Sequence, residues 1–214
     1  MPQHFGGPLA WLMTRLYDAF MASVERAGLT DWRTALLADA RGVTLELGPG
    51  TGTNLARYPD AVERLLLLEP EPHMRSLLAP KLASARCPAE LLAGPAEAIP
   101  LPDHSVDTVV STLVLCSVAD PARVLAEVRR VLRPGGQLLF LEHVRHHDAG
   151  LARWQRRLTP WWSIVAGNCH LDRDTEASLV QAGFALDPIH HAGLPKAPAV
   201  VRPTIRGAAR PHNR

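Results

Sequence analysis

The sequence predicts an α/β fold in which a mostly parallel sheet carries helices on both faces. Three observations support it. Apolar strand patterns alternate with helical patterns between residues 43 and 145. The strand patterns are apolar almost throughout, which is typical of strands that are covered on both faces. The chain has 214 residues, 47% of them hydrophobic, which suits a single domain (residues 1–214) with a sizeable core.

The first forty residues have the pattern of two helices. Apolar residues recur at helical spacing from Leu9 to Val24, and Gly28 is a plausible end for that helix. Asp31 is a suitable cap for a second helix that runs through Ala40. We expect residues 1–40 to form a helical lid at the N-terminal side of the domain.

Strands and helices then alternate through the core, residues 43–145. Five strands are predicted, at Val43–Leu47, Leu65–Glu69, Glu90–Ala93, Val106–Thr112 and Gln137–Glu142. Helices are predicted after Thr53, from Pro72 to about Ala85, and from Ala122 to Leu132. The turn residues 133–136, Arg-Pro-Gly-Gly, end the third of these helices.

Residues 151–171 break the alternation and hold three of the five tryptophans, Trp154, Trp161 and Trp162. A helix follows at Thr175–Ala182 and ends at Gly183. The last two strands are predicted at Phe184–His190 and about Val201–Ala209. Pro203 has no N–H to donate within a sheet, so we expect the final strand to begin at a sheet edge or in a β-bulge.

The most informative stretch, residues 43–54, reads VTLELGPGTGTN. Gly48, Gly50 and Gly52 follow a strand, and glycines let the backbone approach a ligand closely. Glu69 ends the next strand, about twenty residues later, where a carboxylate can accept hydrogen bonds from ribose hydroxyls. Together they predict a nucleoside site. The alternative is a tight turn after a buried strand, with Glu69 as a surface acid.

The spacing of the glycines distinguishes between nucleosides. The dinucleotide fingerprint is G-x-G-x-x-G, whereas here the third glycine comes one position early and Thr53 occupies the late position. Glu46, two residues before Gly48, would repel a pyrophosphate but suits a ligand that carries an ammonium or a sulfonium.

This stretch resembles motif I of the class I S-adenosylmethionine-dependent methyltransferases. The resemblance implies a Rossmann-like, seven-stranded, mostly parallel sheet whose last strand is antiparallel. It also implies that Glu46 faces the methionine moiety, that the glycine turn passes beneath the cofactor, and that Glu69 holds the ribose. The full implied S-adenosyl-L-methionine site comprises Glu46, Gly48, Gly50, Gly52, Asn54, Glu69, Pro70, Ala96, Glu97, Thr112 and Leu113.

Within that class, two groups are similar to this chain. Residues 96–144 resemble small-molecule methyltransferases of the ubiquinone and menaquinone type, in which Ala96-Glu97 approaches the adenine. Residues 112–118 (TLVLCSV), 127–136 (EVRRVLRPGG), 142–144 (EHV) and 154–175 are similar to thiol S-methyltransferases of the endoplasmic reticulum and their bacterial relatives. The animal enzymes begin with a membrane-anchoring hydrophobic segment, which we do not expect here.

The resemblance implies methyl transfer to a small, apolar acceptor, foremost a thiol. Methylation of O, N or C on a lipid, quinone or secondary metabolite is the alternative. Two rivals belong to other classes. A nucleotide-dependent oxidoreductase would be stabilised by NAD, and the missing late glycine argues against it. A non-catalytic protein would bind S-adenosylmethionine but methylate no acceptor in a broad screen.

Two histidines are candidate catalytic residues. His143, at the end of the fifth strand, is the first candidate for a general base or for a group that orients the acceptor. The alternative is a histidine bonded to a loop backbone. Glu142 could polarise His143 or face solvent. His170, beside Cys169, is the second candidate, and Cys116 in its apolar run is expected in the core.

We expect residues 151–171 to form a tryptophan-rich insertion on the acceptor side. Trp154, Trp161 and Trp162 would roof the acceptor pocket, or they would seal the core beneath the insertion.

Composition narrows the partners and the compartment. The net charge of +2, without a long basic run, gives no indication of a nucleic-acid partner. Three widely spaced cysteines argue against a disulfide framework and a zinc site, and we expect no metal. No signal peptide or membrane span is visible, so we expect a cytoplasmic protein that does not insert stably into membranes. Peripheral membrane contact and the oligomeric state stay open.

Overall fold

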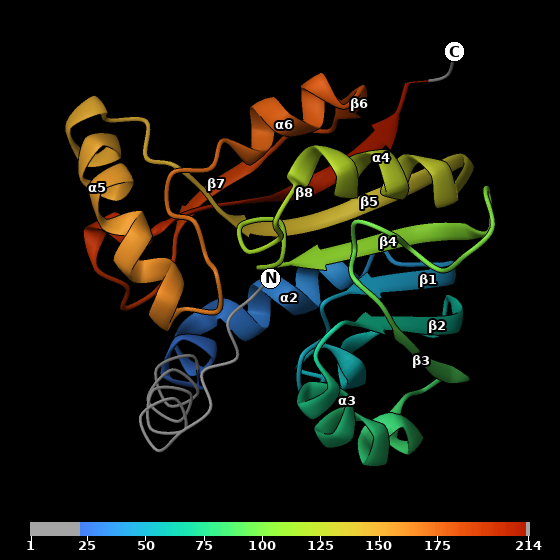
Figure 1. Ribbon diagram of the computed structural model, residues 1–214. Helices are drawn as coiled ribbons and strands as arrows, with labels where there is room; N and C mark the ends of the chain where they lie inside the picture. Colours follow the sequence, from blue (N-terminus) through green and yellow to red (C-terminus); the bar gives the residue numbers. More distant parts are fainter. Residues whose placement is uncertain (1–21, 213–214) are drawn as a thin grey trace.

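The computed structural model describes residues 22–212 (Figure 1). Its centre is an eight-stranded sheet in the order β3-β2-β1-β4-β5-β8-β6, with β7 paired to β8. The strands are β1 (Gly42–Leu47), β2 (Val62–Glu69), β3 (Ala89–Ala93), β4 (Val106–Thr112), β5 (Leu132–His143), β6 (Phe184–Leu186), β7 (His190–Gly193) and β8 (Pro203–Pro211).

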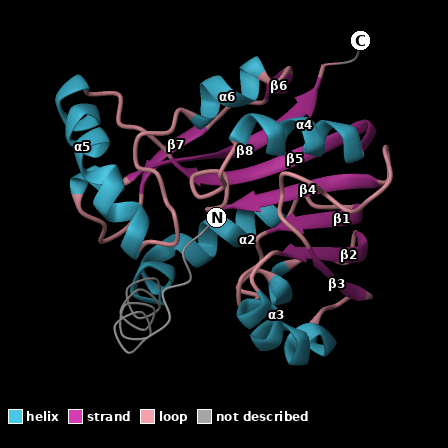
Figure 2. Cartoon of the chain, in the orientation of Figure 1, coloured by secondary structure: helices cyan, strands magenta, loops and turns pink. Residues whose placement is uncertain are grey.

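Helices cover both faces of the sheet, as expected (Figure 2). They are α2 (Thr30–Leu37), α3 (Pro72–Leu78), α4 (Pro121–Val131), α5 (Ala149–Val165) and α6 (Thr175–Gln181). Shorter helical turns are η1 (Glu25–Leu29), η2 (Leu55–Arg57), η3 (Ala79–Ser84) and η4 (Ala199–Val201). Leucines and valines of α4 and α6 pack on one face of the sheet, and those of α2 and α3 on the other.

The prediction of a mostly parallel sheet with an antiparallel last strand is confirmed. Strands β1 to β5 pair in parallel, and β8 runs antiparallel to β5. The sheet has eight strands rather than seven because the strand expected over Phe184–His190 is divided into β6 and β7. Pro188 lies between the two and has no N–H to donate to β8. Pro203 opens β8, which lies inside the sheet.

Two expectations about the helices are corrected. Asp31 does not cap a helix: the chain is already helical from residue 22, bends at Gly28 (φ +128°), and α2 begins at Thr30. Residues 149–165, for which the sequence predicted no regular element, form α5, and the Asp148 carboxylate caps it by accepting from the Leu151 N–H at 2.9 Å. Most of the helix predicted over Leu9–Val24 lies outside the described residues, and so does much of the proposed lid.

Within residues 22–212, no helix combines the length and the apolar character needed to cross a bilayer.

Candidate active site

The carboxyl ends of β1, β2, β4 and β5 meet at one edge of the sheet, as the order of elements predicted. Glu46 pairs with Val110, and Thr112, two residues further along β4, pairs with Leu141. Because side chains alternate along a strand, Glu46, Thr112 and His143 lie on the same face of the sheet at this edge. We call this edge the rim.

The glycine turn after β1 opens the rim. Gly48, Gly50 and Gly52 all have left-handed backbone, with φ of +54°, +56° and +86°. A Cβ at Gly52 would lie 2.6 Å from Leu78 Cδ1, and one at Gly48 would lie 2.9 Å from Val114 Cγ2. A Cβ at Gly50 would meet no atom of the described chain within 4 Å. The outer glycines therefore serve packing, whereas Gly50 borders open space that a ligand could occupy.

Glu69 joins this turn to the loop after β2. Its carboxylate accepts from the Gly50 N–H and the Glu71 N–H, each at 3.0 Å, and the residue is buried. Each carboxylate oxygen retains a second lone pair, so Glu69 can still accept hydrogen bonds from ribose hydroxyls. Pro70 follows as an exposed residue whose carbonyl accepts from Arg75 at 2.7 Å.

Glu46 is buried at the tip of β1 and uses both carboxylate oxygens. Asn54 Nδ2 donates to one at 2.8 Å, and the Tyr58 hydroxyl donates to the other at 2.7 Å. Burial raises the pKa of Glu46, and the hydrogen bonds from Tyr58 and Asn54 and the Arg33 charge oppose this rise. Burial, and after it the negative charge of Glu46, raises the pKa of Tyr58 well above its usual value. The Tyr58 hydroxyl therefore keeps its proton and donates a hydrogen bond to Glu46.

Arg33 brings a buried positive charge to the same place. Its Nη1 donates to Thr112 Oγ1 at 2.8 Å and to Asn54 Oδ1 at 3.2 Å, while its Nε donates to Glu25 at 2.8 Å. Helix α2 is thereby tied to the rim. A guanidinium beside a carboxylate (Arg33 and Glu46) suits a zwitterionic amino-acid group, whose carboxylate and ammonium need opposite charges.

Ala96 and Glu97 follow β3, where the resemblance implied the adenine. Ala96 is buried in the core. The Glu97 carboxylate accepts from the Ala119 N–H at 2.9 Å and from the Asp120 N–H at 3.3 Å. Glu97 therefore holds the segment that enters α4. Leu113, after β4, has a left-handed backbone (φ +61°), a strained conformation for a leucine that is common near functional sites.

Neither expectation for Glu142 is correct. It is fully buried, so it does not face solvent, and it points to the face opposite His143. Its carboxylate accepts from Ser111 Oγ at 2.7 Å and from the N–H groups of Val114 and Cys116 at 3.1 and 3.3 Å. Burial raises the pKa of Glu142, and these hydrogen bonds oppose the rise. Glu142 thus fixes the loop after β4.

His143 is buried with 4% of its surface exposed, and neither of its ring nitrogens has an oxygen or nitrogen partner among residues 22–212. Within these residues the alternative of a bond to a loop backbone is therefore not met. A buried imidazole needs a partner, and a ligand at the rim could supply it. His143 lies beside Cys169, whose pKa is lowered first by the Cys116 thiol and then by His143 and Trp162. The Cys116 pKa is raised by the same thiol contact and by burial.

His170, the second catalytic candidate, is half-buried, and its backbone N–H donates to the Cys116 carbonyl at 2.8 Å. Burial and then the Arg173 charge lower the pKa of its ring. Arg173 itself donates to the Leu115 and Val118 carbonyls and so braces the same loop. The L-x-R-x-T pattern of residues 171–175 is therefore a structural brace, with its leucine and threonine buried.

The three tryptophans of α5 separate into two groups. Trp162 points inward, and its buried Nε1 has no oxygen or nitrogen partner among residues 22–212; it lies next to Cys169. Trp154 and Trp161 are 55% and 75% exposed, so these two rings do not seal the core of the described chain. A roof over the acceptor stays a prediction, for which Trp162 is the best placed of the three.

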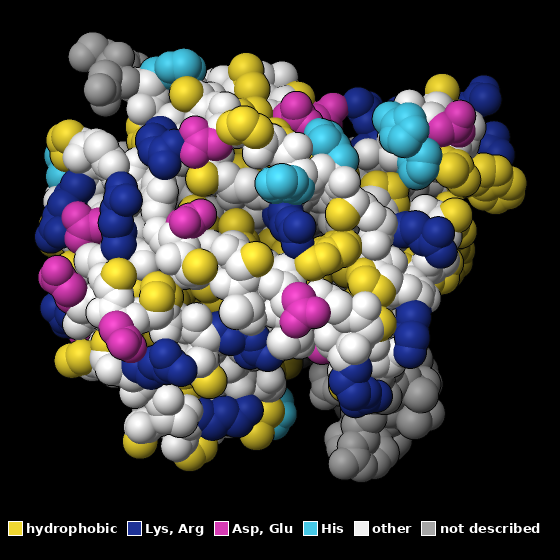
Figure 3. Space-filling view, turned by 180° about the vertical axis from the view of Figure 1, so that it is seen from behind, with side chains coloured by type: hydrophobic (Ala, Val, Ile, Leu, Met, Phe, Trp, Pro, Cys, Tyr) yellow, Lys and Arg dark blue, Asp and Glu magenta, His cyan; other side chains and the backbone are white. Residues whose placement is uncertain are grey.

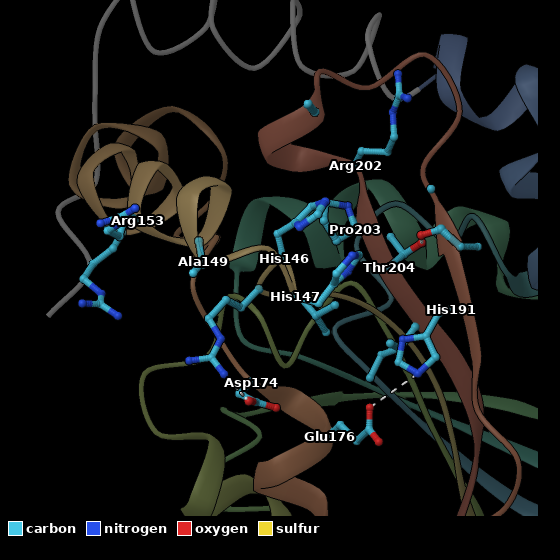
Figure 4. A pocket seen from close by; sticks show the side chains of 18 residues that line it. His146, His147, Ala149, Arg153, Asp174, Glu176, His191, Arg202, Pro203 and Thr204 are labelled. Carbon is cyan, nitrogen blue, oxygen red and sulfur yellow. Dashed lines mark hydrogen bonds and ion pairs between the residues drawn. The ribbon is translucent and has the colours of Figure 1, made fainter.

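A cavity of about 1020 Å³ lies between α5, β7 and β8, and its lining does not include the glycine turn (Figure 4). It contains two ion pairs, Arg145 with Asp174 at 2.7 Å and His191 with Glu176 at 3.6 Å. Histidines and arginines also make up most of the other polar residues that line it. Among residues 22–212, no three histidine, cysteine or acidic side chains are grouped so that they could hold a metal ion.

Sequence reasoning missed Arg33 and Tyr58. A signal existed for Arg33: it lies at helical spacing from Leu29, Leu36 and Leu37, so a cation occupies the apolar face of its helix. A charge in such a position is buried only with partners. For Tyr58, in a turn before Pro59, the local sequence gave no comparable signal.

Comparison with known proteins adds independent evidence. A family model described as a methyltransferase domain matches residues 45–140. Human thiol S-methyltransferase TMT1B is 40% identical over 176 residues, which cover 80% of this chain and 72% of that protein. Human thiol S-methyltransferase TMT1A is 34% identical over 200 residues, which cover 92% and 82%.

Among solved structures, a putative methyltransferase from Bacillus halodurans superimposes with a TM-score of 0.64. The match covers 82% of this chain and 94% of that one at 16% identity, so it speaks for the fold alone.

Proposed function

Because this chain belongs to the methyltransferase family that includes the thiol S-methyltransferases, we propose that it transfers a methyl group from S-adenosylmethionine to a small, apolar thiol. The observation that carries this proposal is the 40% identity to human TMT1B over 80% of the chain. That the reaction is a methyl transfer rests on the family; that the acceptor is a thiol is our inference.

The rim fits S-adenosylmethionine. Open space beside Gly50 leaves room for the nucleoside, and Glu69 retains lone pairs for the ribose hydroxyls. Arg33 and Glu46 supply the opposite charges that suit the carboxylate and the ammonium of the methionine part. This fit supports the cofactor-binding residues expected from the sequence. The support is strongest for Gly50, Glu69 and Glu46.

S-adenosylmethionine supplies an electrophilic methyl group, which passes to the acceptor sulfur. The protein needs mainly to align the two and to exclude water, and good alignment is worth roughly 7–11 kcal/mol. We assign His143 to the acceptor side. Its imidazole, which has no oxygen or nitrogen partner among the described residues, would accept the S–H proton as the sulfur attacks. Trp162 would wall the same space with its ring.

A thiol suits this site better than a hydroxyl. A thiol is far more acidic than an alcohol (a free cysteine thiol has a pKa of about 8.5), so a single histidine can take its proton where a hydroxyl would need a stronger base. Methylation of O, N or C remains the alternative acceptor chemistry, and binding without catalysis the alternative of another class.

Matched acceptors test this proposal. Purified protein would be incubated with S-adenosylmethionine that carries an isotope-labelled methyl group and with an alkyl thiol, the alcohol of equal chain length, the amine and a quinol. We expect labelled thioether and an equal amount of S-adenosylhomocysteine from the thiol, and far less product from the others. Preferential labelling of the alcohol, amine or quinol would refute thiol specificity, and no labelling of any acceptor would favour the non-catalytic alternative.

The compartment is also a proposal. Cys87, Cys116 and Cys169 are free, and two of them are close enough to share a hydrogen bond without being joined. Three widely spaced cysteines without a C-x-x-C pair are typical of proteins from a reducing compartment, and we propose the cytoplasm.

A further inference from the structure

Helix α5 exposes an apolar stripe. Trp154, Leu158 and Trp161 recur at helical spacing and are 55%, 36% and 75% exposed, and Ile164 beside them is 54% exposed. They are four of the six large hydrophobic residues that the described chain exposes. Figure 3 shows hydrophobic side chains gathered on the edge of the molecule where α5 lies. Exposed apolar patches of this kind mark interaction sites.

The opposite side of α5 holds the helix firmly in this orientation. Gln155 is fully buried, its Oε1 accepts from the His146 N–H at 2.6 Å, and its Nε2 donates to the Val200 carbonyl at 2.8 Å. Thr159, one turn further, is buried and donates to Asp172 Oδ1, outside the helix, at 3.2 Å. The apolar stripe is therefore presented outward by a helix that is anchored on its polar side.

The charges of α5 are all positive. The helix contains Arg153, Arg156 and Arg157 and no aspartate or glutamate. Within residues 22–212 none of these arginines forms an ion pair, although Arg157 lies over the Trp154 ring at 5.8 Å. Arg153 and Arg156 border the cavity beside the helix, and Figure 4 shows Arg153 on α5 at the margin of this cavity.

We propose that the outer face of α5 binds the surface of an anionic membrane. Trp154, Leu158, Trp161 and Ile164 would enter the interfacial layer. Arg157, which lies over the Trp154 ring, and Arg153 at the flank of the stripe would meet lipid phosphates, whereas Arg156 lies toward the cavity. Tryptophan at the apolar–polar boundary with flanking arginine is the usual composition of a helix that lies in this layer. The contact is peripheral, since the helix is fixed to the sheet on its other side.

A membrane fits this face better than a protein partner. A stable protein–protein interface buries about 800 Å² on each partner, and an aromatic side chain offers about 150–250 Å² when fully exposed. Two partly exposed tryptophans and two aliphatic side chains provide less than that. The absence of an acidic residue from α5, with Arg157 beside the stripe, also complements the negative charge of anionic lipids.

The position of α5 connects the proposed membrane-binding face with the proposed reaction. Of the steps in this subsection, only this connection rests on the proposed function. Trp162, on the inner side of the helix, lies beside Cys169 and so near His143. Apolar thiols partition into bilayers, so a membrane-bound α5 would bring the acceptor side next to the phase that holds them.

Vesicle flotation tests the membrane contact without reference to activity. The whole chain would be mixed with vesicles of phosphatidylcholine alone or of an equimolar mixture with phosphatidylglycerol. We expect flotation with the anionic vesicles, less with neutral ones, and weakening by salt. The double variant Trp154→Ala/Trp161→Ala should lower the partition coefficient at least about tenfold. Val180→Ala, a 56% exposed residue on α6, is the matched control and should bind like the parent.

Several outcomes would overturn the proposal. One is no flotation with anionic vesicles; another is equal flotation of parent and double variant, which would assign binding to another part of the chain. A dimer that is abolished by the double variant, without lipid binding, would make the stripe a protein interface. Unchanged melting temperatures exclude misfolding as the cause. Methylation of a water-soluble thiol should be unaffected in the double variant, so failure here and failure of the proposed function are distinguishable.

Discussion

Arg33 is the cation of the buried network at the rim, and it contacts residues from three separate elements. Without Arg33, Glu25 loses its ion pair, and the side-chain oxygens of Asn54 and Thr112 each lose one hydrogen-bond donor. Arg33→Met should lower the free energy of unfolding by about 3 kcal/mol, because the buried partners lose the charge that satisfies them. Urea denaturation measures this loss. The exposed Arg41→Met is the control, and an equal, small loss for both variants would contradict the role of Arg33.

His143 can be separated from a structural histidine by its pH dependence. His143→Gln should lower kcat for a thiol by about 10²-fold at neutral pH, with little change in affinity for S-adenosylmethionine. The deficit should shrink as the pH approaches the pKa of the acceptor thiol, because the thiolate then forms without a base. A deficit that is constant with pH would indicate that His143 only supports the structure.

Cys169 provides a second pH-dependent signal. Its pKa is lowered from 9.0 to about 5, chiefly by the Cys116 thiol and then by His143. Since the folded state favours the thiolate, the stabilisation is present above the unfolded pKa and is lost as pH falls through the folded pKa. Thiolate absorbance that disappears in Cys169→Ser should therefore titrate in the folded protein with a midpoint of about 5.

Two variants check the cause of that shift. Cys116→Ser should move the Cys169 midpoint upward, because it removes the thiol that contributes most to the lowering. Cys87→Ser should remove only a step at higher pH, because burial raises the pKa of Cys87. A Cys169 midpoint no lower than that of Cys87 would contradict the arrangement of His143, Cys116 and Cys169.

At the scale of elements, the glycine turn separates packing from ligand binding. Gly52→Ala should lower stability by more than the roughly 1–2 kcal/mol of left-handed strain, because its Cβ would approach Leu78 Cδ1 to 2.6 Å. Gly50→Ala should cost only that strain and yet weaken the binding of S-adenosylmethionine, since its Cβ enters open space. Denaturation and calorimetry measure the two effects. Equal losses of stability, with affinity preserved in Gly50→Ala, would show that the turn is only structural.

How well the elements could be predicted depended on local signals. Strand β4 was predicted with its observed bounds, Val106–Thr112, because a continuous apolar run follows a clear turn. Helix α5 was missed because Pro160 interrupts its pattern and its apolar stripe points away from the core. The division between β6 and β7 followed from Pro188, which the strand interpretation overlooked.

The residues of the candidate site could likewise be predicted only where the local sequence carries a signal. The glycines and Glu69 could be found because their positions along the strands carry the signal. Arg33 and Tyr58 could not be assigned to the site, since only tertiary packing brings Arg33 to Asn54 and Tyr58 to Glu46. The direction of Glu142 was within reach, because a strand turns successive side chains to opposite faces.

The molecule as a whole fixes its rim from both sides of the sheet. Arg33 ties α2 to β4 on one face, and Glu142 and Arg173 hold residues 114–118 on the other. Such bracing preorganises a ligand site, because the positions of its groups are set before the ligand arrives. It also explains why buried charges are retained at the rim, where they cost more than apolar residues would.

Calorimetric titration of S-adenosylmethionine into two matched variants tests this account most directly. Glu69 and Glu63 lie at opposite ends of β2, the first at the rim and the second exposed at the far end. Glu69→Gln should weaken binding at least about tenfold, the effect of a lost hydrogen bond to a charged group, and Glu63→Gln should bind like the parent. No heat of binding with the parent protein, or equal affinity for all three, would contradict a cofactor site at this rim.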